Sequence, residues 1–150
     1  MRWGFTGSQQ GFPENVLLEE LALLNLQKGD VVFTGGCVGV DSQVAHLVAK
    51  HYPEVKQVIV APHIAHLPKY NQNKLDKKTF KLGIVFQLPM QDSYKEHPLL
   101  CYKDRNEKLV HLSDKMLAFK RGSKPRSGTQ MTINMAFKVG KLHKLVALDD

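Results

Sequence analysis

Three glycines separate a strand-like segment from a helix-like one in the stretch VVFTGGCVGVDSQVAHLVAK. Residues 31–34 are β-branched or aromatic, which favours a strand, whereas apolar residues recur at helical spacing over 40–50. Gly35, Gly36 and Gly39 therefore lie in a strand-to-helix turn, where a backbone without Cβ atoms can take positive φ angles and approach a ligand. The helix start adds N–H groups without intrahelical acceptors and a partial positive charge. These features predict a phosphate or carboxylate site, with a tight turn that binds nothing as the alternative.

The same alternation of strand-like and helix-like segments continues along the chain and sets the fold class. Strands are expected at 2–6, 31–34, 56–62, 82–89, 115–120 and 143–148, and helices at about 13–24, 40–50, 103–114 and 127–140. Irregular segments are expected at 63–83 and 91–101. Because helices alternate with strands, we predict an α/β, Rossmann-like three-layer sandwich with a mostly parallel central sheet and helices on both faces.

Length and cysteine content favour a single domain in a reducing compartment. The 150 residues are enough for one domain with a sizeable core. Cys37 and Cys101 lie far apart, without the spacing of a metal site, and no apolar leader segment precedes the first strand, so we expect a cytoplasmic protein. No apolar run approaches the roughly 20 residues that span a bilayer, which argues against membrane insertion. His63 and His66 lack a third ligand, and we expect no metal and no cofactor.

The formal net charge of +7 favours anionic partners. Basic residues gather in two places. One cluster comprises Lys69, Lys74, Lys77, Lys78 and Lys81, and the other Lys120, Arg121, Lys124 and Arg126. The first is expected to be a solvated loop, because lysines usually lie in water. The second contains no acidic residue and follows a predicted strand, which makes it the better candidate for binding an anion.

Three predicted loops place glycine or small residues where a strand ends: TGSQ at 6–9, TGGCVGVD at 34–41 and KRGSKPRSGT at 120–129. Ligands of open parallel sheets lie beyond the carboxyl ends of the strands. The N–H groups and hydroxyls of these loops can bind phosphate oxygens, and Arg121, Lys124 or Arg126 can add charge. The sequence contains no GxxxxGK[ST], GxGxxG or GxSxG motif, so neither a P-loop, a dehydrogenase-type dinucleotide site nor a nucleophile elbow is indicated. We therefore predict a phosphate-bearing ligand at this end of the sheet.

Four segments taken in order, GFTGSQ, TGGCVGVDSQVAH, RNEKLVHLSDKMLAF and SGTQMTINMAFKVGK, resemble the SLOG superfamily of Rossmann-like nucleotide-binding domains. This superfamily includes the Lonely Guy phosphoribohydrolases, molybdenum cofactor carriers, the DNA-processing protein A family and sensors of nucleotide-derived signals. TGGCVGVDSQVAH is most similar to the DNA-processing branch, whereas RNEKLV resembles the hydrolase and carrier branches. The resemblance leaves out about 62–100, and it implies one SLOG-like nucleotide-binding domain over 1–150.

The resemblance, the three loops and the position of His63 directly after the third predicted strand together give the predicted ligand-binding residues. These are Gly7, Ser8, Gln9, Gly35, Gly36, Cys37, Gly39, Asp41, His63, Arg105, Asn106, Arg121, Gly122, Ser127, Gly128 and Thr129. Some of them have structural alternatives: Asp41 could only stabilise the start of its helix, Arg105 could form a surface salt bridge, and Cys37 could be a small turn residue.

One departure from the family pattern concerns catalysis. Lonely Guy enzymes carry the pattern PGGxGTxxE, whose glutamate acts on the ribose and the glycosidic bond, whereas this chain has PRSGTQMT with Thr132 in the place of the glutamate. A threonine cannot carry the negative charge that stabilises an oxocarbenium-like centre, nor act as a general base near neutral pH. The resemblance therefore implies binding more than hydrolysis, with Arg105 as an anion binder, and we predict no catalytic residue.

Three functions stay open at this point. The first is non-catalytic binding of a small phosphate-bearing nucleotide derivative, ADP-ribose-like, a nucleoside monophosphate or a pterin nucleotide, by a carrier, sensor or sequestering protein. The second is binding of single-stranded nucleic acid, as in the DNA-processing branch, since Tyr70 and Phe80 lie among the lysines and could stack on bases. The third is a nucleotide N-glycosidase that uses another carboxylate, such as Glu107. We also expect a homo-oligomer.

Overall fold

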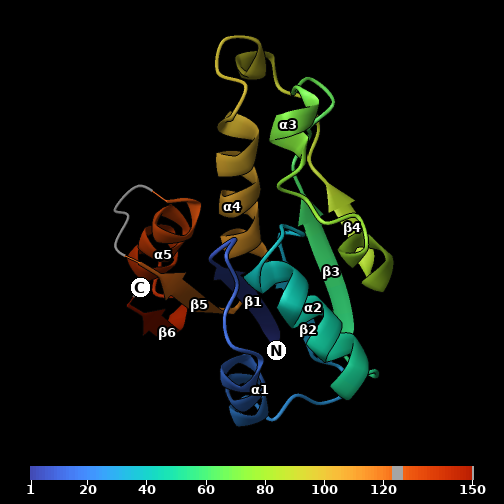
Figure 1. Ribbon diagram of the computed structural model, residues 1–150, viewed down its shortest axis with the longest axis vertical. Coiled ribbons are helices and arrows are strands. Elements are labelled where there is room, and N and C mark those ends of the chain that lie inside the picture. The colour runs from blue at the N-terminus through green and yellow to red at the C-terminus, as the bar shows by residue number, and fades with distance from the viewer. Residues whose placement is uncertain (123–126, 150) are drawn as a thin grey trace.

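A computed structural model of the chain describes residues 1–122 and 127–149. Figure 1 shows a central sheet with helices on both of its sides. The strands are β1 (Arg2–Gly7), β2 (Val31–Thr34), β3 (Lys56–Ala61), β4 (Ile84–Gln87), β5 (Lys115–Arg121) and β6 (Leu142–Leu148). The helices are α1 (Glu14–Leu23), α2 (Val40–His51), α3 (Lys69–Gln72), α4 (Leu100–Leu112) and α5 (Gly128–Lys138), with 3-10 turns η1 (Thr79–Leu82) and η2 (Asp92–Lys95).

The six strands form one sheet in the order β4-β3-β2-β1-β5-β6, and all the pairs between them are parallel. From β1 the chain adds strands outward to β4 at one edge, and it then returns to the other side of β1 to add β5 and β6. This topology confirms the predicted α/β, Rossmann-like fold. Because β1 is where the strand order reverses, the carboxyl ends of β1, β2 and β5 are where a ligand site is expected.

Each face of the sheet has its own apolar core. On one face, Leu17 of α1 and Val44 of α2 pack in a cluster with Phe5 of β1. On the other face, Leu109 of α4 and Ala136 of α5 pack in a second cluster with Met116 of β5. Helices therefore cover both faces, as the helical spacing of the apolar residues predicted, and the three layers expected from the sequence are present.

Element boundaries differ from the prediction mainly between β3 and α4. The segment 63–83, expected to be irregular, contains α3 and η1, and the strand expected at 82–89 is only four residues long. Pro13, expected at a first helical position, is instead the N-cap of α1. The helix α4 begins at Leu100 and has 13 residues, and no helix within 1–122 or 127–149 is long and apolar enough to cross a membrane.

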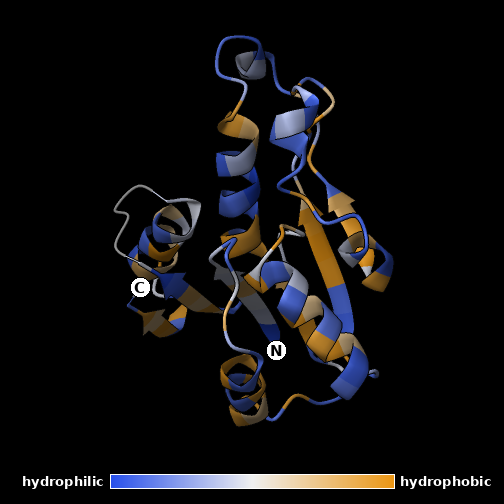
Figure 2. Cartoon of the chain, viewed as in Figure 1, coloured by the Kyte–Doolittle hydropathy of each residue, from blue (hydrophilic) through white to orange (hydrophobic). Residues whose placement is uncertain are grey.

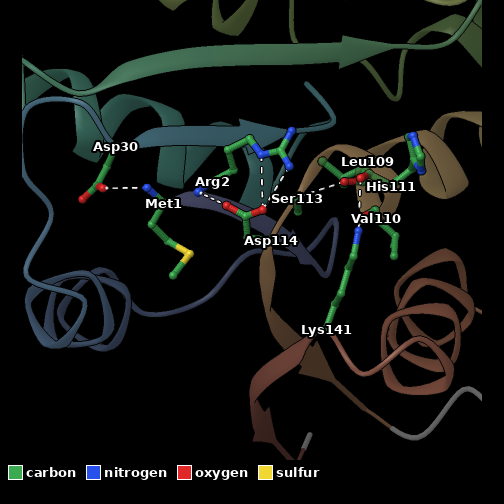
Figure 3. Close-up of polar contacts among 9 residues, drawn as sticks. All are labelled: Met1, Arg2, Asp30, Leu109, Val110, His111, Ser113, Asp114 and Lys141. Atoms are coloured by element: carbon green, nitrogen blue, oxygen red, sulfur yellow. Dashed lines mark hydrogen bonds and ion pairs between the residues drawn. The ribbon is translucent and has the colours of Figure 1, made fainter.

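The amino ends of the strands are held together by polar contacts (Figure 3). Nε and Nη2 of Arg2 donate to Oδ1 of Asp114 at 3.3 and 3.0 Å, and the terminal ammonium of Met1 lies 3.2 Å from Asp30 Oδ1. Lys141 Nζ donates to two of the last carbonyl groups of α4, at 2.9 and 3.1 Å. These three cations therefore lie against carboxylate or carbonyl oxygens of the chain itself. At the carboxyl ends of the strands, by contrast, basic residues line a pocket.

Candidate ligand-binding site

A pocket with a volume of about 750 Å³ lies at the carboxyl ends of the strands. It is lined by the loop after β1, the loop after β2, one face of α4, the end of β5 and the start of α5. The predicted ligand residues that line it are Gly7, Ser8, Gln9, Gly35, Cys37, Asp41, Arg105, Asn106, Arg121, Gly122, Ser127, Gly128 and Thr129. The fold thus brings segments that are more than a hundred residues apart in sequence to one cavity.

Three of the predicted ligand residues do not line this pocket. A Cβ on Gly36, which has a φ of 71°, would lie 2.8–2.9 Å from Ile59 and Phe80, so this position faces the protein interior. A Cβ on Gly39 would lie 2.4–2.5 Å from backbone atoms of the loop after β1. His63 stacks on His66, with ring centroids 5.8 Å apart. Gly36 therefore packs against side chains of the core and Gly39 against the backbone of the loop after β1, and neither position opens into the pocket.

The loop Gly35–Gly39, called the glycine loop here, is already filled by a carboxylate of the chain. The Cys37 N–H donates to Asp41 Oδ2 at 3.2 Å, and the Gly35 N–H bonds to the same carboxylate. The Val38 N–H donates to the carbonyl of Lys74 at 2.8 Å. Donors that the sequence suggested for a ligand therefore bond within the protein. Asp41 is 7 % exposed, and burial raises its pKa to about 6 although the Arg105 guanidinium lowers it.

Arg105 lies under the pocket rather than on the helix surface. Arg105 is 5 % exposed, and its Nη1 donates to the carbonyl of Gly35. Nη2 lies 3.3 Å from Cys37 Sγ, and Nε donates to Asn106 Oδ1 at 2.8 Å. A thiol is a weak acceptor, and the charge of the nearby Asp41 carboxylate also favours the protonated guanidinium. The surface salt bridge considered for Arg105 is thus not its structural role. Burial raises the pKa of Cys37, as suits a packed turn residue more than a reactive thiolate.

The first residues of α5, Ser127–Thr129, are called the α5 turn and differ from the glycine loop. Ser127 caps the helix as predicted, since its Oγ accepts from the Gln130 N–H at 3.0 Å. The N–H groups of Gly128 and Thr129 belong to the first helical positions, which have no intrahelical acceptor, and α5 has no acidic residue in its first turn. Asn106 Nδ2 lies 3.9 Å from the Cβ position of Gly128. Its amide oxygen is held by Arg105, which directs the NH₂ group of Asn106 toward this turn.

The pocket is strongly basic. Its lining includes Lys74, Arg105, Lys120 and Arg121, and Asp41 is the one carboxylate among the described lining residues. Lys120 Nζ donates to Gln130 Oε1 at 2.6 Å, and Arg121 Nη1 donates to the carbonyl of Gly11 at 3.0 Å. These hydrogen bonds help to hold both side chains in place at the pocket. Lys124 and Arg126, which were also expected to add charge, lie outside the described residues.

Sequence reasoning did not include five of the lining residues among the ligand residues. These are Thr6, Gln10, Lys74, Leu109 and Lys120. Lys120 was visible in the second basic cluster, but Lys74 was expected in a solvated loop. It reaches the pocket because Leu75 pairs with Cys37 and the Asp76 N–H donates to the carbonyl of Gly36 at 2.9 Å. This long-range pairing has no local signature in the sequence.

Residues considered for hydrolysis lie away from the pocket. Thr132 is fully buried and its Oγ1 donates to the carbonyl of Gly128 at 2.9 Å. Glu107 lies on the surface of α4, 3.9 Å from Lys103 Nζ, and lines a separate hollow. Within the part of the chain that the structure describes, no three His, Cys, Asp or Glu residues are grouped so that they could hold a metal ion.

Comparisons with known proteins identify the fold. No family model matches the sequence, and no curated protein matches it. Among solved structures, the chain is similar to DNA processing protein A (DprA) from Streptococcus pneumoniae, with a TM-score of 0.62 and 17% sequence identity. The similarity covers 97% of this chain and 49% of that chain, so this chain spans about half the length of the similar protein. At this identity the similarity establishes a shared Rossmann-like fold, and it extends over the segment 62–100, which the sequence resemblance left out.

Proposed function

We propose that this chain binds a small phosphate-bearing nucleotide derivative, as a non-catalytic carrier, sensor or sequestering protein, with the phosphate at the α5 turn. The observation that carries the proposal is the convergence of donors there. The N–H groups of Gly128 and Thr129 begin a helix with no acid in its first turn, and Asn106 presents its NH₂ group beside them. Charge-assisted and backbone hydrogen bonds of this kind are the usual means of binding phosphate.

The dimensions and charge of the pocket suit a nucleotide. A volume of about 750 Å³ is within the range of roughly 300–1,000 Å³ typical of small-molecule sites. Lys120, Arg121 and Arg105 line the same pocket as the α5 turn, which favours one or two phosphate groups. Ser8, Gln9 and Gln10 supply hydroxyl and amide groups for a sugar or base. ADP-ribose-like molecules, nucleoside monophosphates and pterin nucleotides all meet these requirements.

The absence of catalysis is part of the proposal, and it rests on the positions of the carboxylates. Asp41 is the one carboxylate among the described lining residues, and it already accepts hydrogen bonds from the glycine loop. Thr132 is on the buried face of α5, and Glu107 is outside the pocket. A nucleotide N-glycosidase needs a carboxylate free to stabilise the developing positive charge on the sugar. A reducing, cytoplasmic setting is also proposed, because Cys37 and Cys101 are both free thiols.

Binding of single-stranded nucleic acid is the second candidate. It is favoured by the similarity to a protein named DNA processing protein A and by the cluster Lys69, Lys74, Lys77, Lys78 and Lys81. Tyr70 in this cluster is exposed and available for stacking, whereas Phe80 packs near Gly36. Lys74 turns into the pocket, so the surface part of the cluster is formed by the other four lysines.

The proposal is tested with the isosteric variant Asn106→Asp. It keeps an acceptor for Arg105 Nε but replaces the NH₂ donor beside the α5 turn with an oxygen that carries negative charge. We expect thermal-shift and calorimetric titrations of the parent protein to detect ADP-ribose, a nucleoside monophosphate or a pterin nucleotide, and a ligand at a hundred times its Kd to add about 2.7 kcal/mol of stability. Asn106→Asp should weaken binding at least about tenfold. The control is Asn134→Asp, which makes the same charge change on the exposed side of α5.

Two further measurements separate the alternatives. Affinity for a fluorescent oligonucleotide should fall steeply with salt and be lost in Lys77→Glu/Lys78→Glu if a strand is the ligand, because these lysines lie outside the pocket. If nucleotides cause no thermal shift in the parent protein, and oligonucleotide binding is lost in the lysine variant, the nucleic-acid function would replace our proposal. Chromatography would detect any release of free base from nucleoside monophosphates. Release that is abolished in Asp41→Asn would show that the chain is a nucleotide N-glycosidase.

A further inference from the structure

The edge strand β4 is the most exposed apolar strand of the sheet. Ile84, Val85 and Phe86 are 56 %, 46 % and 41 % exposed, whereas neighbouring β3 is mostly buried. Figure 2 shows β4 as a hydrophobic segment at the outer edge of the sheet. An exposed apolar edge strand is a template for pairing with another strand. This surface is independent of the ligand pocket, since none of these three residues lines it.

Alternate backbone N–H and C=O groups of β4 point away from β3, toward the outer edge of the sheet. The Leu88 N–H donates to the carbonyl of Ala61 in β3 at 2.9 Å. Because successive residues of a strand point their N–H groups to opposite sides, Ile84 and Phe86 also direct theirs toward β3, and Val85 and Gln87 direct theirs away from the sheet. The outer edge of β4 therefore offers the N–H and C=O groups of Val85 and Gln87 to a partner strand.

We propose that the partner is a second copy of this chain, with two β4 strands paired antiparallel about a two-fold axis at Phe86. In this register Val85 of one copy exchanges two hydrogen bonds with Gln87 of the other, and the symmetric pair repeats them. Phe86 lies opposite Phe86 at a non-hydrogen-bonded position, where cross-strand side chains approach most closely. The result is one continuous sheet through two copies.

The same register seats Ile84 against an existing hollow. Lys108 Nζ of α4 lies 5.5 Å from the ring of Phe86, so Phe86 faces the α4 side of the sheet, and alternation places Ile84 and Leu88 on that side too. Leu88, with Tyr94 and residues of α4, lines a hollow of about 330 Å³. Since Ile84 of one copy lies opposite Leu88 of the other, the most exposed side chain of β4 packs beside this hollow.

Charge complementarity favours a second copy over an unrelated strand. Lys77, Lys78 and Lys81 precede β4. The segment that follows it carries two acids, Asp92 and Glu96, against one lysine, Lys95, whose Nζ lies 4.0 Å from Asp92 Oδ1. Antiparallel pairing brings the basic entry to β4 of one copy alongside the acidic exit of the other, twice in the dimer. Parallel pairing would place like charges together, which is unfavourable. The chain therefore carries both halves of a self-complementary edge.

Disulfide cross-linking tests the register. We expect Phe86→Cys to form a disulfide-linked dimer under mild oxidation on a non-reducing gel, because its two copies lie opposite each other. Val85→Cys should remain unlinked, because Val85 lies opposite Gln87 rather than opposite itself. Cys37 and Cys101 are buried and should stay unlinked in both variants. A Phe86→Cys protein that stays monomeric on the gel would overturn the proposal, as would efficient linking through Val85→Cys.

Sedimentation velocity over a dilution series tests the association itself. The parent protein should show a monomer–dimer equilibrium, and Phe86→Asp should raise its dissociation constant at least about tenfold. Leu145→Asp is the matched control, since Leu145 is a similarly exposed residue, 44 %, on the other edge strand, β6. A parent protein that is monomeric throughout, or a dimer lost in Leu145→Asp and kept in Phe86→Asp, would refute the β4 interface. The β4 interface between two copies would also be refuted if the parent protein formed a larger complex only after an unrelated peptide strand was added.

Discussion

The glycine loop after β2 and the α5 turn after β5 are two glycine-containing helix starts at the same end of one sheet, yet their N–H groups are in opposite situations. Asp41, in the first turn of α2, accepts from the glycine loop, whereas α5 has no acid in its first turn. A glycine-rich turn before a helix is therefore insufficient evidence for an anion site. What decides is whether a carboxylate of the chain itself already takes the donors.

Arg105 belongs to both regions, and its loss should have the largest effect. Arg105→Ala leaves the Asp41 carboxylate and the Gly35 carbonyl without a cation, so we expect the free energy of unfolding to fall by about 3–5 kcal/mol in urea denaturation. Nucleotide binding should be lost as well. The control is Arg2→Ala, which removes an arginine from a solvent-exposed pair with Asp114 and should change stability far less. Equal losses would mean that Arg105 is not a buried structural cation.

A glycine-to-alanine change in the glycine loop should destabilise the protein far more than the same change in the α5 turn. Gly39→Ala places a Cβ 2.4–2.5 Å from the backbone of the loop after β1, at a φ of 90°, and should cost about 3 kcal/mol of stability. In Gly128→Ala the nearest atom would be Asn106 Nδ2 at 3.9 Å, so stability should change by less than about 0.5 kcal/mol. Thermal unfolding of both variants distinguishes them. If Gly128→Ala were as unstable as Gly39→Ala, the α5 turn would be packed like the glycine loop.

The smallest effect concerns the ionisation of Asp41. Because burial raises its folded pKa to about 6, above its ordinary value of 3.8, its contribution to stability is present at low pH and is lost as the pH rises through about 6. The difference in unfolding free energy between the parent protein and Asp41→Asn should shrink by roughly 2 kcal/mol from about pH 4 to about pH 6. Using the difference removes the opposite contributions of Asp30, Asp76 and Asp114, whose pKa values are lowered. A difference independent of pH would show an Asp41 with an ordinary pKa.

The fold could be predicted because its signals are local. Apolar residues at strand and helix spacing, and loops such as TGSQ and KRGSKPRSGT between them, are properties of short segments. The lining of the pocket by Gly7 and Ser127 follows from the same rule, since the carboxyl ends of parallel strands meet at one edge. Arg105, in the middle of α4, was expected there only from the family resemblance.

The state of the site could not be predicted from the same signals. Whether Asp41 would face a ligand or the glycine loop depends on side-chain packing around Arg105, and the sequence allowed both. Lys74 reaches the pocket through pairing of Leu75 with Cys37, which lies 38 residues away in a different segment. Gly36 and Gly39 were ambiguous for the same reason. A glycine in a turn indicates that positive φ is allowed, but not whether a ligand or the chain itself packs against that glycine.

The central position of β1 also governs how the chain acquires its structure. β2, β3 and β4 follow β1 in order, so one side of the sheet can form early, but the other edge of β1 pairs with β5, and Arg2 meets Asp114 112 residues later. At a synthesis rate of about 5–20 residues per second, this edge stays unpaired for roughly 6–20 s. Non-local parallel pairing is slow, and an unpaired apolar edge invites association with other chains. The nascent chain therefore passes through a period in which its most central strand is its most aggregation-prone one.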